Sequence, residues 1–183
     1  MLKHVEKIIG SCKKPEATFC QYDQRAPEVA EYLKGRIESH LAEVTIEHIG
    51  STAIPDCPGK GVIDLMALYP AKHLNDILDL LLTMGFKRQG KEFRNRYPDD
   101  RPGLMGTFEF DGTSFLVYIH IIHKESYEVK RFRIFRDILK NNSKLLSEYI
   151  CEKKRIISEG ATDTDDYSEM KQTIIRRILG ENL

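Results

Sequence analysis

The stretch IEHIGSTAIPDCPGKGVIDLMAL, residues 46–68, decides the fold of this chain. Residues 44–49 are rich in Val, Thr and Ile and predict a strand, because such side chains favour extended backbone. Gly50-Ser51-Thr52 ends that strand, and a loop with two prolines and two glycines follows over residues 54–61. The nearly continuous apolar run at residues 62–68 then predicts a second strand, covered on both faces.

The turn between the two strands has the residue types of a phosphate-binding corner. Gly50 allows close approach of the backbone to a ligand, unpaired backbone N–H groups attract anions, and Ser51 adds a hydroxyl donor. The same residues also fit a plain turn with a serine cap. Gly50, Ser51 and Thr52 are therefore candidate ligand-binding residues, with the plain turn as the alternative.

Asp64 is the one charged residue in the second strand. Burying a carboxylate is costly unless a cation or hydrogen bonds compensate it. Mg²⁺ prefers carboxylates together with phosphate oxygens of the substrate, so Asp64 is a candidate metal ligand. The alternative is an ion pair with a neighbouring Arg or Lys, or a cap on a loop.

Apolar residues at helical spacing flank the two strands. A helix that begins at Pro27 carries Val29, Leu33, Ile37 and Leu41 on one face. A second helix, after Pro70, ends at Gly85 and carries Leu74, Ile77, Leu78 and Leu81. Three further apolar stripes after Ser126 predict helices. Strands followed by helices indicate an α+β or mixed α/β fold.

These elements predict a single compact unit in three parts. Residues 1–17 are expected to form a polar helical extension. Residues 18–125 form the core, in which the polar, glycine-rich residues 86–114 predict irregular hairpin strands. Residues 126–183 form a helical region packed on that core.

Residues 115–122 form another buried strand, interrupted only by His120. Strand alternation places His120 on the same face as Tyr118. If this strand neighbours residues 62–68, His120 meets Asp64 across the sheet. Such a pair holds one softer cation, such as Mn²⁺ or Zn²⁺, or acts as a base with its orienting group. The alternative is a core histidine whose hydrogen bonds are satisfied.

A strand ending in Gly-Ser, followed by an aspartate on the next strand, resembles the nucleotidyltransferase superfamily and, more closely, the GrpB family. The matching residues of the central segment are Ile46-Glu47-His48, Gly50-Ser51-Thr52, Pro55, Lys60, Ile63 and Asp64. Those further on are Phe135-Arg136-Asp137, Tyr167 and Lys171. The resemblance implies a nucleotidyltransferase-like mixed β-sheet core flanked by helices, with a helical carboxy-terminal region.

The resemblance also implies metal-dependent nucleotidyl or phosphoryl transfer to an unidentified acceptor. Asp64 and His120 are then catalytic and hold Mg²⁺ or Mn²⁺. The residues that bind the phosphates of a nucleoside triphosphate are then Gly50, Ser51, Thr52, Lys60 and Arg136. As alternatives, Lys60 is a solvated loop lysine, and Arg136 pairs with an acid to lock the helical region onto the core.

The chain departs from these patterns at three positions. Met66 stands where an active nucleotidyltransferase has its second metal carboxylate, and a thioether does not replace a carboxylate for Mg²⁺. Asp56 and Gly61 stand where Gly and Pro are usual. The alternative function is therefore non-catalytic: a regulatory or binding module for a nucleotide or another anionic metabolite, with a degenerate active site.

Composition limits the partners. Among 183 residues, 28 Lys and Arg balance 28 Asp and Glu, which excludes a general nucleic-acid binder. No apolar stretch is long enough to cross a bilayer. The four cysteines form no CxxC pair and have no zinc-like spacing, so reduced thiols in a cytoplasmic protein are expected. The predicted partner is a small anionic or nucleotide ligand.

Overall fold

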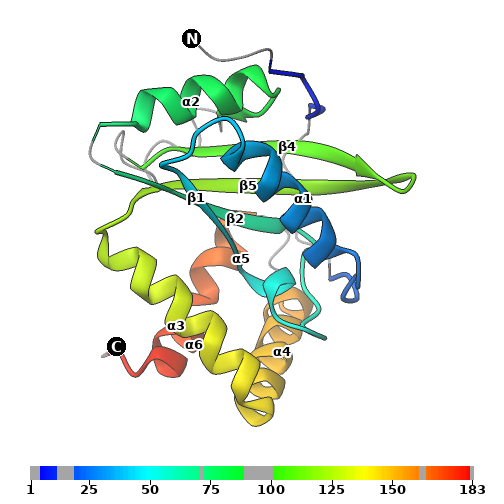
Figure 1. The fold of residues 1–183 in the computed structure, drawn as a ribbon. Helices are drawn as coiled ribbons and strands as arrows, with labels where there is room; N and C mark the ends of the chain where they lie inside the picture. Colours follow the sequence, from blue (N-terminus) through cyan, green and yellow to red (C-terminus); the bar gives the residue numbers. More distant parts are fainter. Residues whose placement is uncertain (1–4, 12–18, 71, 89–100, 161–163, 182–183) are drawn as a thin grey trace.

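A five-stranded mixed sheet forms the centre of the molecule (Figure 1). Its order is β1-β2-β5-β4-β3, and β2 and β5 are parallel while the other neighbours are antiparallel. The strands are β1 (Thr45–Ile49), β2 (Ile63–Tyr69), β3 (Lys87–Arg88), β4 (Gly103–Phe110) and β5 (Thr113–His123). This computed structural model describes residues 5–11, 19–70, 72–88, 101–160 and 164–181. The mixed α/β class and the three strands predicted at 44–49, 62–68 and 115–122 are confirmed.

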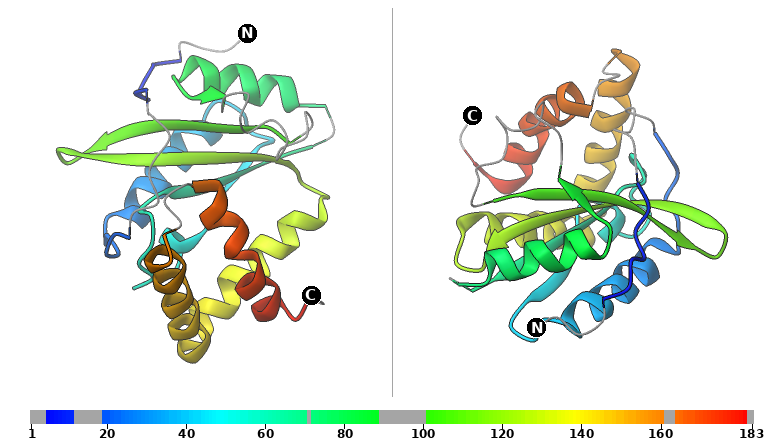
Figure 2. Two further views of the ribbon diagram at one scale, coloured as in Figure 1. Left: turned by 180° about the vertical axis from the view of Figure 1, so that it is seen from behind. Right: turned by 90° about the horizontal axis from the view of Figure 1, so that it is seen from above.

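Helices cover both faces of the sheet (Figure 2). On one face lie α1 (Ala26–Glu38) and α2 (Leu74–Thr83). On the other lie α3 (Tyr127–Asn141), α4 (Ser143–Ser158), α5 (Thr164–Met170) and α6 (Gln172–Leu179). Among the described helices, none is both long and apolar enough to cross a membrane. The carboxy-terminal helices thus form a layer of their own against the sheet.

Alternation along β2 divides its side chains between the two layers. Ile63, Leu65 and Ala67 enter the large core beneath α1 and α2. Met66 and Leu68 enter a smaller core with Val129 of α3. This burial on both faces explains the apolar run in the sequence. It also places Asp64, which shares the face of Met66, on the side of the carboxy-terminal helices.

The amino-terminal segment differs from the expectation. Residues 5–11 are not helical: the N–H groups of Ile8 and Ile9 donate to the Met84 carbonyl, and Gly10 forms a bridge with Thr107. Ile9 is 2% exposed and packs into the large core, so burying this apolar side chain and pairing its backbone outweigh helix formation. The helical prediction is wrong for residues 5–11. Residues 1–4 and 12–17 lie outside the described part.

The polar, glycine-rich region 86–114 was predicted to hold one or two irregular hairpin strands, one of them at Thr107–Phe110; that strand is confirmed, but it is longer and regular. β4 pairs with β5 over its whole length, from Gly103 to Phe110. The glycines of this strand have packing reasons, because a β-carbon on Gly106 would overlap the side chain of Ile9. Glycine content therefore reflected close packing here and not irregular backbone. Residues 89–100 of the same region lie outside the described residues.

Candidate functional site

The turn after β1 packs directly against Asp64. Ile49 and Asp64 are partners in the antiparallel ladder between β1 and β2. The next residue, Gly50, therefore packs against the side chain of Asp64. Gly50 has a φ of +71°, and a β-carbon there would stand 2.9 Å from Cβ and 3.0 Å from Cγ of Asp64. Only glycine fits both the backbone angle and the space. The Gly-Ser turn and the carboxylate predicted from the sequence therefore adjoin one another.

Asp64 meets His120 across β2 and β5. The Asp64 Oδ1 atom lies 3.7 Å from Nε2 of His120. In the parallel ladder of β2 and β5, His120 is paired with Met66, so it approaches Asp64 diagonally on the same face of the sheet. The Asp64 side chain is 27% exposed and that of His120 is 12% exposed, so both border the surface. Within the described residues, Asp64 forms no ion pair with a lysine or an arginine. The structure thus brings this pair together as expected, while its metal-binding and catalytic roles stay predictions.

The described side chains beside Asp64 offer Mg²⁺ no second carboxylate. Mg²⁺ needs near-octahedral oxygen ligands, usually from more than one carboxylate or from carboxylate and phosphate together. Met66, the next residue on this face of β2, is fully buried and offers no oxygen. Within the described parts of the chain, no group of three or more His, Cys, Asp or Glu side chains is placed to hold a metal ion.

The buried side chain of Thr52 stabilises the turn by two hydrogen bonds. Thr52 is buried, and its hydroxyl donates to the Val62 carbonyl over 3.0 Å. The same hydroxyl therefore accepts from Nε2 of His48, also at 3.0 Å. Burial lowers the pKa of His48 to about 4, against the opposing effect of the Asp64 charge, so the imidazole is neutral and its N–H is available as donor. The Thr52 side chain holds the loop after β1 to the start of β2.

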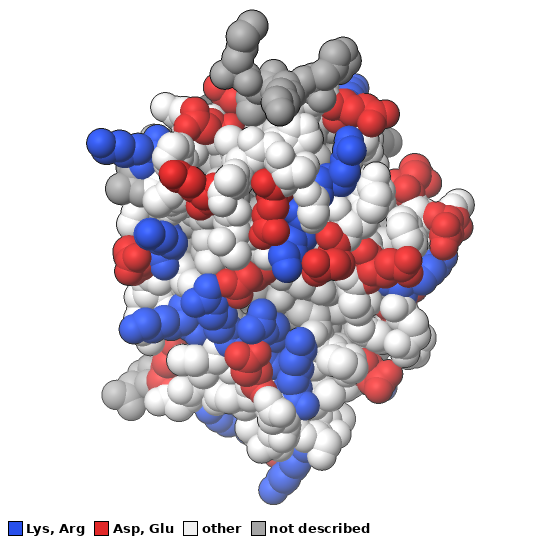
Figure 3. Space-filling view, viewed as in Figure 1, with Lys and Arg blue, Asp and Glu red and all other residues white. Residues whose placement is uncertain are grey.

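Arg136 joins α3 to β1. Its guanidinium donates to the His48 carbonyl over 3.2 Å, lies 3.7 Å from a Glu47 oxygen and donates to Asp137 over 2.8 Å. Arg133 holds Glu47 with two further nitrogens. Figure 3 shows basic side chains gathered over this part of the molecule, among them those of α3. These contacts match the second role considered for Arg136, which is to lock the helical region onto the sheet.

Three lysines lie close enough to one another to interact, and one of them, Lys153, is near Ser51. Lys60 and Lys171 place Nζ 5.1 Å and 4.6 Å from the ring centroid of Tyr167. Lys153 approaches from α4: a β-carbon on Gly59 would lie 3.3 Å from Lys153 Nζ and 3.0 Å from Ser51 Oγ. We call Lys60, Lys153 and Lys171 the lysine cluster. It brings the loop after β1, helix α4 and the junction of α5 and α6 to one place.

Burial and mutual repulsion act on the lysines of the cluster. Lys153 is 1% exposed, and its ammonium donates to the Pro58 carbonyl and to Cys57 Sγ, at 3.2 Å from the sulfur. Burial lowers the pKa of Lys153. Burial, with the charges of Lys60 and Lys153, lowers the pKa of Lys171 to about 7. In the described residues, neither Lys153 nor Lys171 has a carboxylate within ion-pair distance.

The sequence contained a signal for Lys153 that pattern reading missed. Tyr149, Lys153 and Ile156 are the buried residues of α4 and follow helical spacing, so a lysine occupies the apolar stripe. A charged residue inside such a stripe either pairs or serves a ligand. Lys171 belongs to the Tyr167-x-x-x-Lys171 pattern, which places both residues one helical turn apart. Their approach to Ser51 depends on how the helices pack.

The loop between β1 and β2 keeps its course despite its unusual residues. Asp56 has a φ of +58° and Gly61 a φ of +70°, both in the left-handed region. Aspartate is one of the few residues other than glycine that tolerate this conformation. The substitution of Asp56 for the usual glycine thus leaves the backbone path of the loop available.

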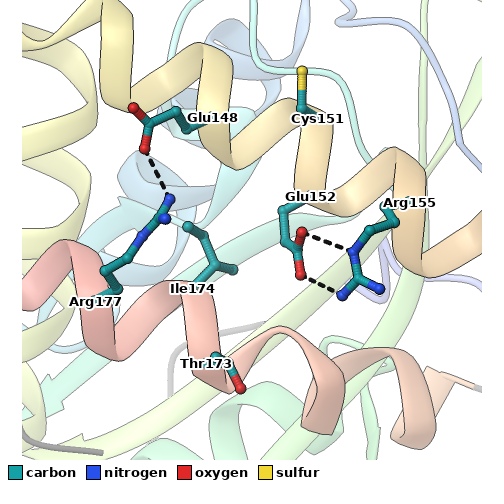
Figure 4. A pocket seen from close by; sticks show the side chains of 7 residues that line it. All are labelled: Glu148, Cys151, Glu152, Arg155, Thr173, Ile174 and Arg177. Atoms are coloured by element: carbon teal, nitrogen blue, oxygen red, sulfur yellow. Dashed lines mark hydrogen bonds and ion pairs between the residues drawn. The ribbon is translucent and has the colours of Figure 1, made fainter.

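A concave region lies between α4 and α6, and none of the candidate residues lines it (Figure 4). It has a cavity volume of about 630 Å³ and is lined by Glu148, Cys151, Glu152, Arg155, Thr173, Ile174 and Arg177. Its charged residues neutralise one another, because Arg177 pairs with Glu148 at 2.8 Å and Arg155 with Glu152 at 2.6 Å. In contrast, Lys153 and Lys171 have no carboxylate within ion-pair distance among the described residues, so we place the candidate site at the Gly-Ser turn.

Several known proteins are similar to this chain in sequence or in structure. A family model described as GrpB protein matches residues 16–181. A UPF0157 protein of Streptomyces coelicolor is 30% identical over 176 residues, which cover 94% of this chain and 87% of that protein. The crystal structure of the conserved protein GrpB from Enterococcus faecalis gives a TM-score of 0.69 at 20% identity, covering 89% of this chain and 98% of that chain. The Cid1 poly(U) polymerase gives a TM-score of 0.44 at 15% identity, over 83% of this chain and 48% of that chain.

Proposed function

This chain belongs to the GrpB family, and we propose that it binds a small phosphate-bearing ligand, such as a nucleotide, beside the Gly50–Ser51 turn and the lysine cluster. The observation that carries the proposal is the approach of Lys60, Lys153 and Lys171 to one another, with Lys153 and Ser51 both next to Gly59. Like charges gathered in a partly buried place oppose folding unless an anion offsets them. Lys153 and Lys171 have no carboxylate within ion-pair distance among the described residues, and a phosphate group supplies that anion.

The polar groups around the turn support the same ligand class. The Ser51 hydroxyl forms no hydrogen bond with any described residue, so it is available to a phosphate oxygen. Gly50 lets the backbone approach closely, and Lys60 reaches the site from the same loop. In this proposal Ser51 and the lysine cluster contact the ligand, whereas Thr52 and Arg136 hold the turn and α3 in position.

Isothermal titration calorimetry with ATP, UTP and inorganic tripolyphosphate tests the proposal. We expect saturable binding, weakened about tenfold or more in Ser51→Ala and Lys153→Met, since each loses a hydrogen bond or ion pair to the ligand. Lys144→Met, an exposed change on α4, is the charge-matched control and keeps the wild-type affinity. No heat of binding and no rise in melting temperature with any of these compounds would reject the proposal.

Proton uptake provides an independent readout. A bound anion stabilises the ammonium form of Lys171, so binding at about pH 8 takes up protons, and the observed heat depends on the ionisation enthalpy of the buffer. Lys171→Met loses most of that dependence. Binding with the same proton uptake in the variant would remove Lys171 from the ligand site.

Nucleotidyl or phosphoryl transfer is the second candidate, favoured by the Asp64–His120 pair at 3.7 Å beside the turn. In this version Asp64 orients His120, and the imidazole accepts a proton from the attacking hydroxyl of an acceptor. The test is turnover of a nucleoside triphosphate in the presence of candidate acceptors, with Asp64→Asn and His120→Gln as variants. Turnover that both variants retain would reject these roles.

A further inference from the structure

We propose that the outward side of helix α3 is a docking surface for an acidic, amphipathic helix of another protein. This surface, which we call the α3 face, consists of Tyr127, Lys130, Arg133, Ile134, Asp137 and Lys140. The inference does not depend on a ligand at the Gly-Ser turn, because neither Ser51 nor any residue of the lysine cluster belongs to the α3 face.

An apolar seam runs along the α3 face. Tyr127 is 69% exposed and Ile134 is 50% exposed, which makes them the two most exposed large apolar side chains among the described residues. They are seven residues apart and therefore lie on one side of the helix, whereas the buried residues Val129 and Leu139 lie on the other. Single exposed apolar residues are common, but two at the heptad spacing form a seam against which a second helix packs.

Cations border this seam and set the charge of the partner. Lys130 lies within the seam and Lys140 near the end of the helix, and neither has a carboxylate within ion-pair distance among the described residues. Arg133 binds Glu47, yet 44% of its side chain remains exposed. Figure 3 shows the resulting band of basic side chains on the side of the molecule where α3 lies. Such a band attracts acidic segments and repels basic ones.

The carboxylate of Asp137 favours a protein partner over a membrane or a nucleic acid. Its side chain is 53% exposed and follows Ile134 by one helical turn on the same face. A hydrogen bond from Arg136 lowers the pKa of Asp137, so the negative charge persists at neutral pH. Anionic lipids and phosphate backbones are negative throughout and repel this carboxylate, whereas a protein helix is able to present a basic residue to it. The partner helix is therefore acidic except for one Lys or Arg opposite Asp137.

The dimensions of α3 set the strength of the contact. Its 15 residues extend over about 22 Å, which is enough for one helix of similar length to lie alongside it. A contact of this size is small and reversible, so we expect a dissociation constant in the micromolar range. The single negative charge, at Asp137, divides the positive charges of the face unequally and so favours one direction of the partner helix.

Fluorescence anisotropy of the full chain with labelled synthetic peptides tests the proposal. The matched peptide is a helix of about 18 residues with leucine at heptad spacing, glutamate on both flanks and one lysine. The shuffled peptide has the same composition without the leucine seam. We expect the matched peptide to bind about tenfold more tightly than the shuffled one, and to lose about tenfold in affinity between about 50 and about 300 mM NaCl. Equal affinity of the two peptides, or no binding of either, would overturn the proposal.

Variants of exposed residues locate the contact on the chain. Ile134→Gln and Lys130→Glu are each expected to weaken binding of the matched peptide about tenfold, because one removes an apolar anchor and the other reverses a charge. The controls are Met170→Gln, at an exposed apolar residue of α5, and Lys144→Met, at an exposed lysine of α4, and both should retain the wild-type affinity. Unchanged melting temperatures verify that all of these variants are folded. Wild-type affinity in both Ile134→Gln and Lys130→Glu contradicts the proposal.

A charge exchange distinguishes direct contact from an indirect structural effect. Matched peptides in which one glutamate at a time is replaced by lysine are titrated against Lys130→Glu and against the wild type. We expect one of these peptides to recover most of the affinity that Lys130→Glu loses, and to bind the wild type more weakly, because opposite charges then face each other only in the exchanged pair. If no peptide recovers the affinity, position 130 does not contact the helix and the proposal fails.

Vesicles and a single-stranded oligonucleotide represent the competing kinds of partner. Vesicles of phosphatidylcholine with about one quarter phosphatidylglycerol, and oligodeoxythymidine, are each mixed with the full chain at about 150 mM NaCl. We expect neither to bind. Binding of either one that is tighter than that of the matched peptide and is abolished by Lys130→Glu would assign the α3 face to that partner and overturn the proposal.

Discussion

Gly50 contacts Asp64 so closely that a β-carbon at position 50 would overlap the carboxylate of Asp64. The contact fixes the end of β1 against the beginning of β2, and the next residue, Ser51, lies next to Gly59, as does Lys153. The Gly-Ser turn and the carboxylate are therefore one rigid arrangement. A change at Gly50 is expected to disturb both.

Replacing Gly50 with alanine should lower the free energy of unfolding by about 1–3 kcal/mol, because its φ of +71° is strained for any residue with a β-carbon. Urea denaturation measures the change. Gly35→Ala is the control: Gly35 is an exposed residue within α1, has no neighbour within 4 Å of an added β-carbon, and should gain about 0.5–1 kcal/mol. Equal effects of the two substitutions would contradict this account of the turn.

Lys171 should make stability depend on pH. Its pKa is about 7 in the folded chain and 10.5 when unfolded, so between these values the unfolded state binds a proton that the native state does not. Unfolding then takes up a proton, and stability rises with pH across this window. Relative to Lys171→Met, the wild type should gain stability from about pH 7 to about pH 10, as measured by urea denaturation. Lys144→Met controls for the loss of one charge, and a constant difference for Lys171→Met would contradict the prediction.

His48 should make stability depend on pH in the acidic range. Its pKa falls from 6.5 when unfolded to about 4 in the folded chain because the ring is buried. As pH decreases from about 6.5 to 4, the unfolded state gains a proton first, and stability is lost. His48→Gln keeps an N–H donor for Thr52 without titrating, so it should lose less stability over this interval. Titration of the imidazole by nuclear magnetic resonance checks the pKa directly, and a value near 6.5 would disprove the prediction.

The Glu47 carboxylate should contribute measurably to the attachment of α3. Arg133 and Arg136 both approach it, and its side chain is only 19% exposed. Glu47→Gln is expected to lower the free energy of unfolding by about 1–3 kcal/mol, since charged hydrogen bonds in a half-buried place are lost. Glu159→Gln is the control, because its partner Arg155 and Glu159 itself are 51% and 46% exposed, and it should change stability by about 0.5 kcal/mol or less. Similar losses in both variants would show that Glu47 is not a special anchor.

Much of the fold could be predicted because its signals are local. The apolar run of β2 follows from burial on both faces, and the periodic stripe of α1 reflects one buried side. The prediction failed at residues 5–11, where Ile9 pairs with distant backbone and enters the core. No local pattern reports a partner that lies far along the chain.

The candidate site also has a part that the sequence predicted and a part that it did not. The short motif around Gly50 and Asp64 gave the turn and the carboxylate, and strand alternation placed His120 on the same face of the sheet as Asp64 once the two strands were neighbours. The contacts of Arg136 with Glu47, and the use of the Thr52 hydroxyl within the loop, were not specified by the motif. These depend on which hydrogen-bonding groups tertiary packing brings within reach.

By itself, the sequence determined the strands, the glycine-dependent turn and the family, because backbone preference and burial period act over a few neighbouring residues. Only the tertiary structure decided that Lys60, Lys153 and Lys171 approach one another, with Lys153 near Ser51. The electrostatic interaction between charged groups depends on the distance between them in space, not on their separation in the sequence. Helices α4 to α6 set those distances when they pack against the loop between β1 and β2.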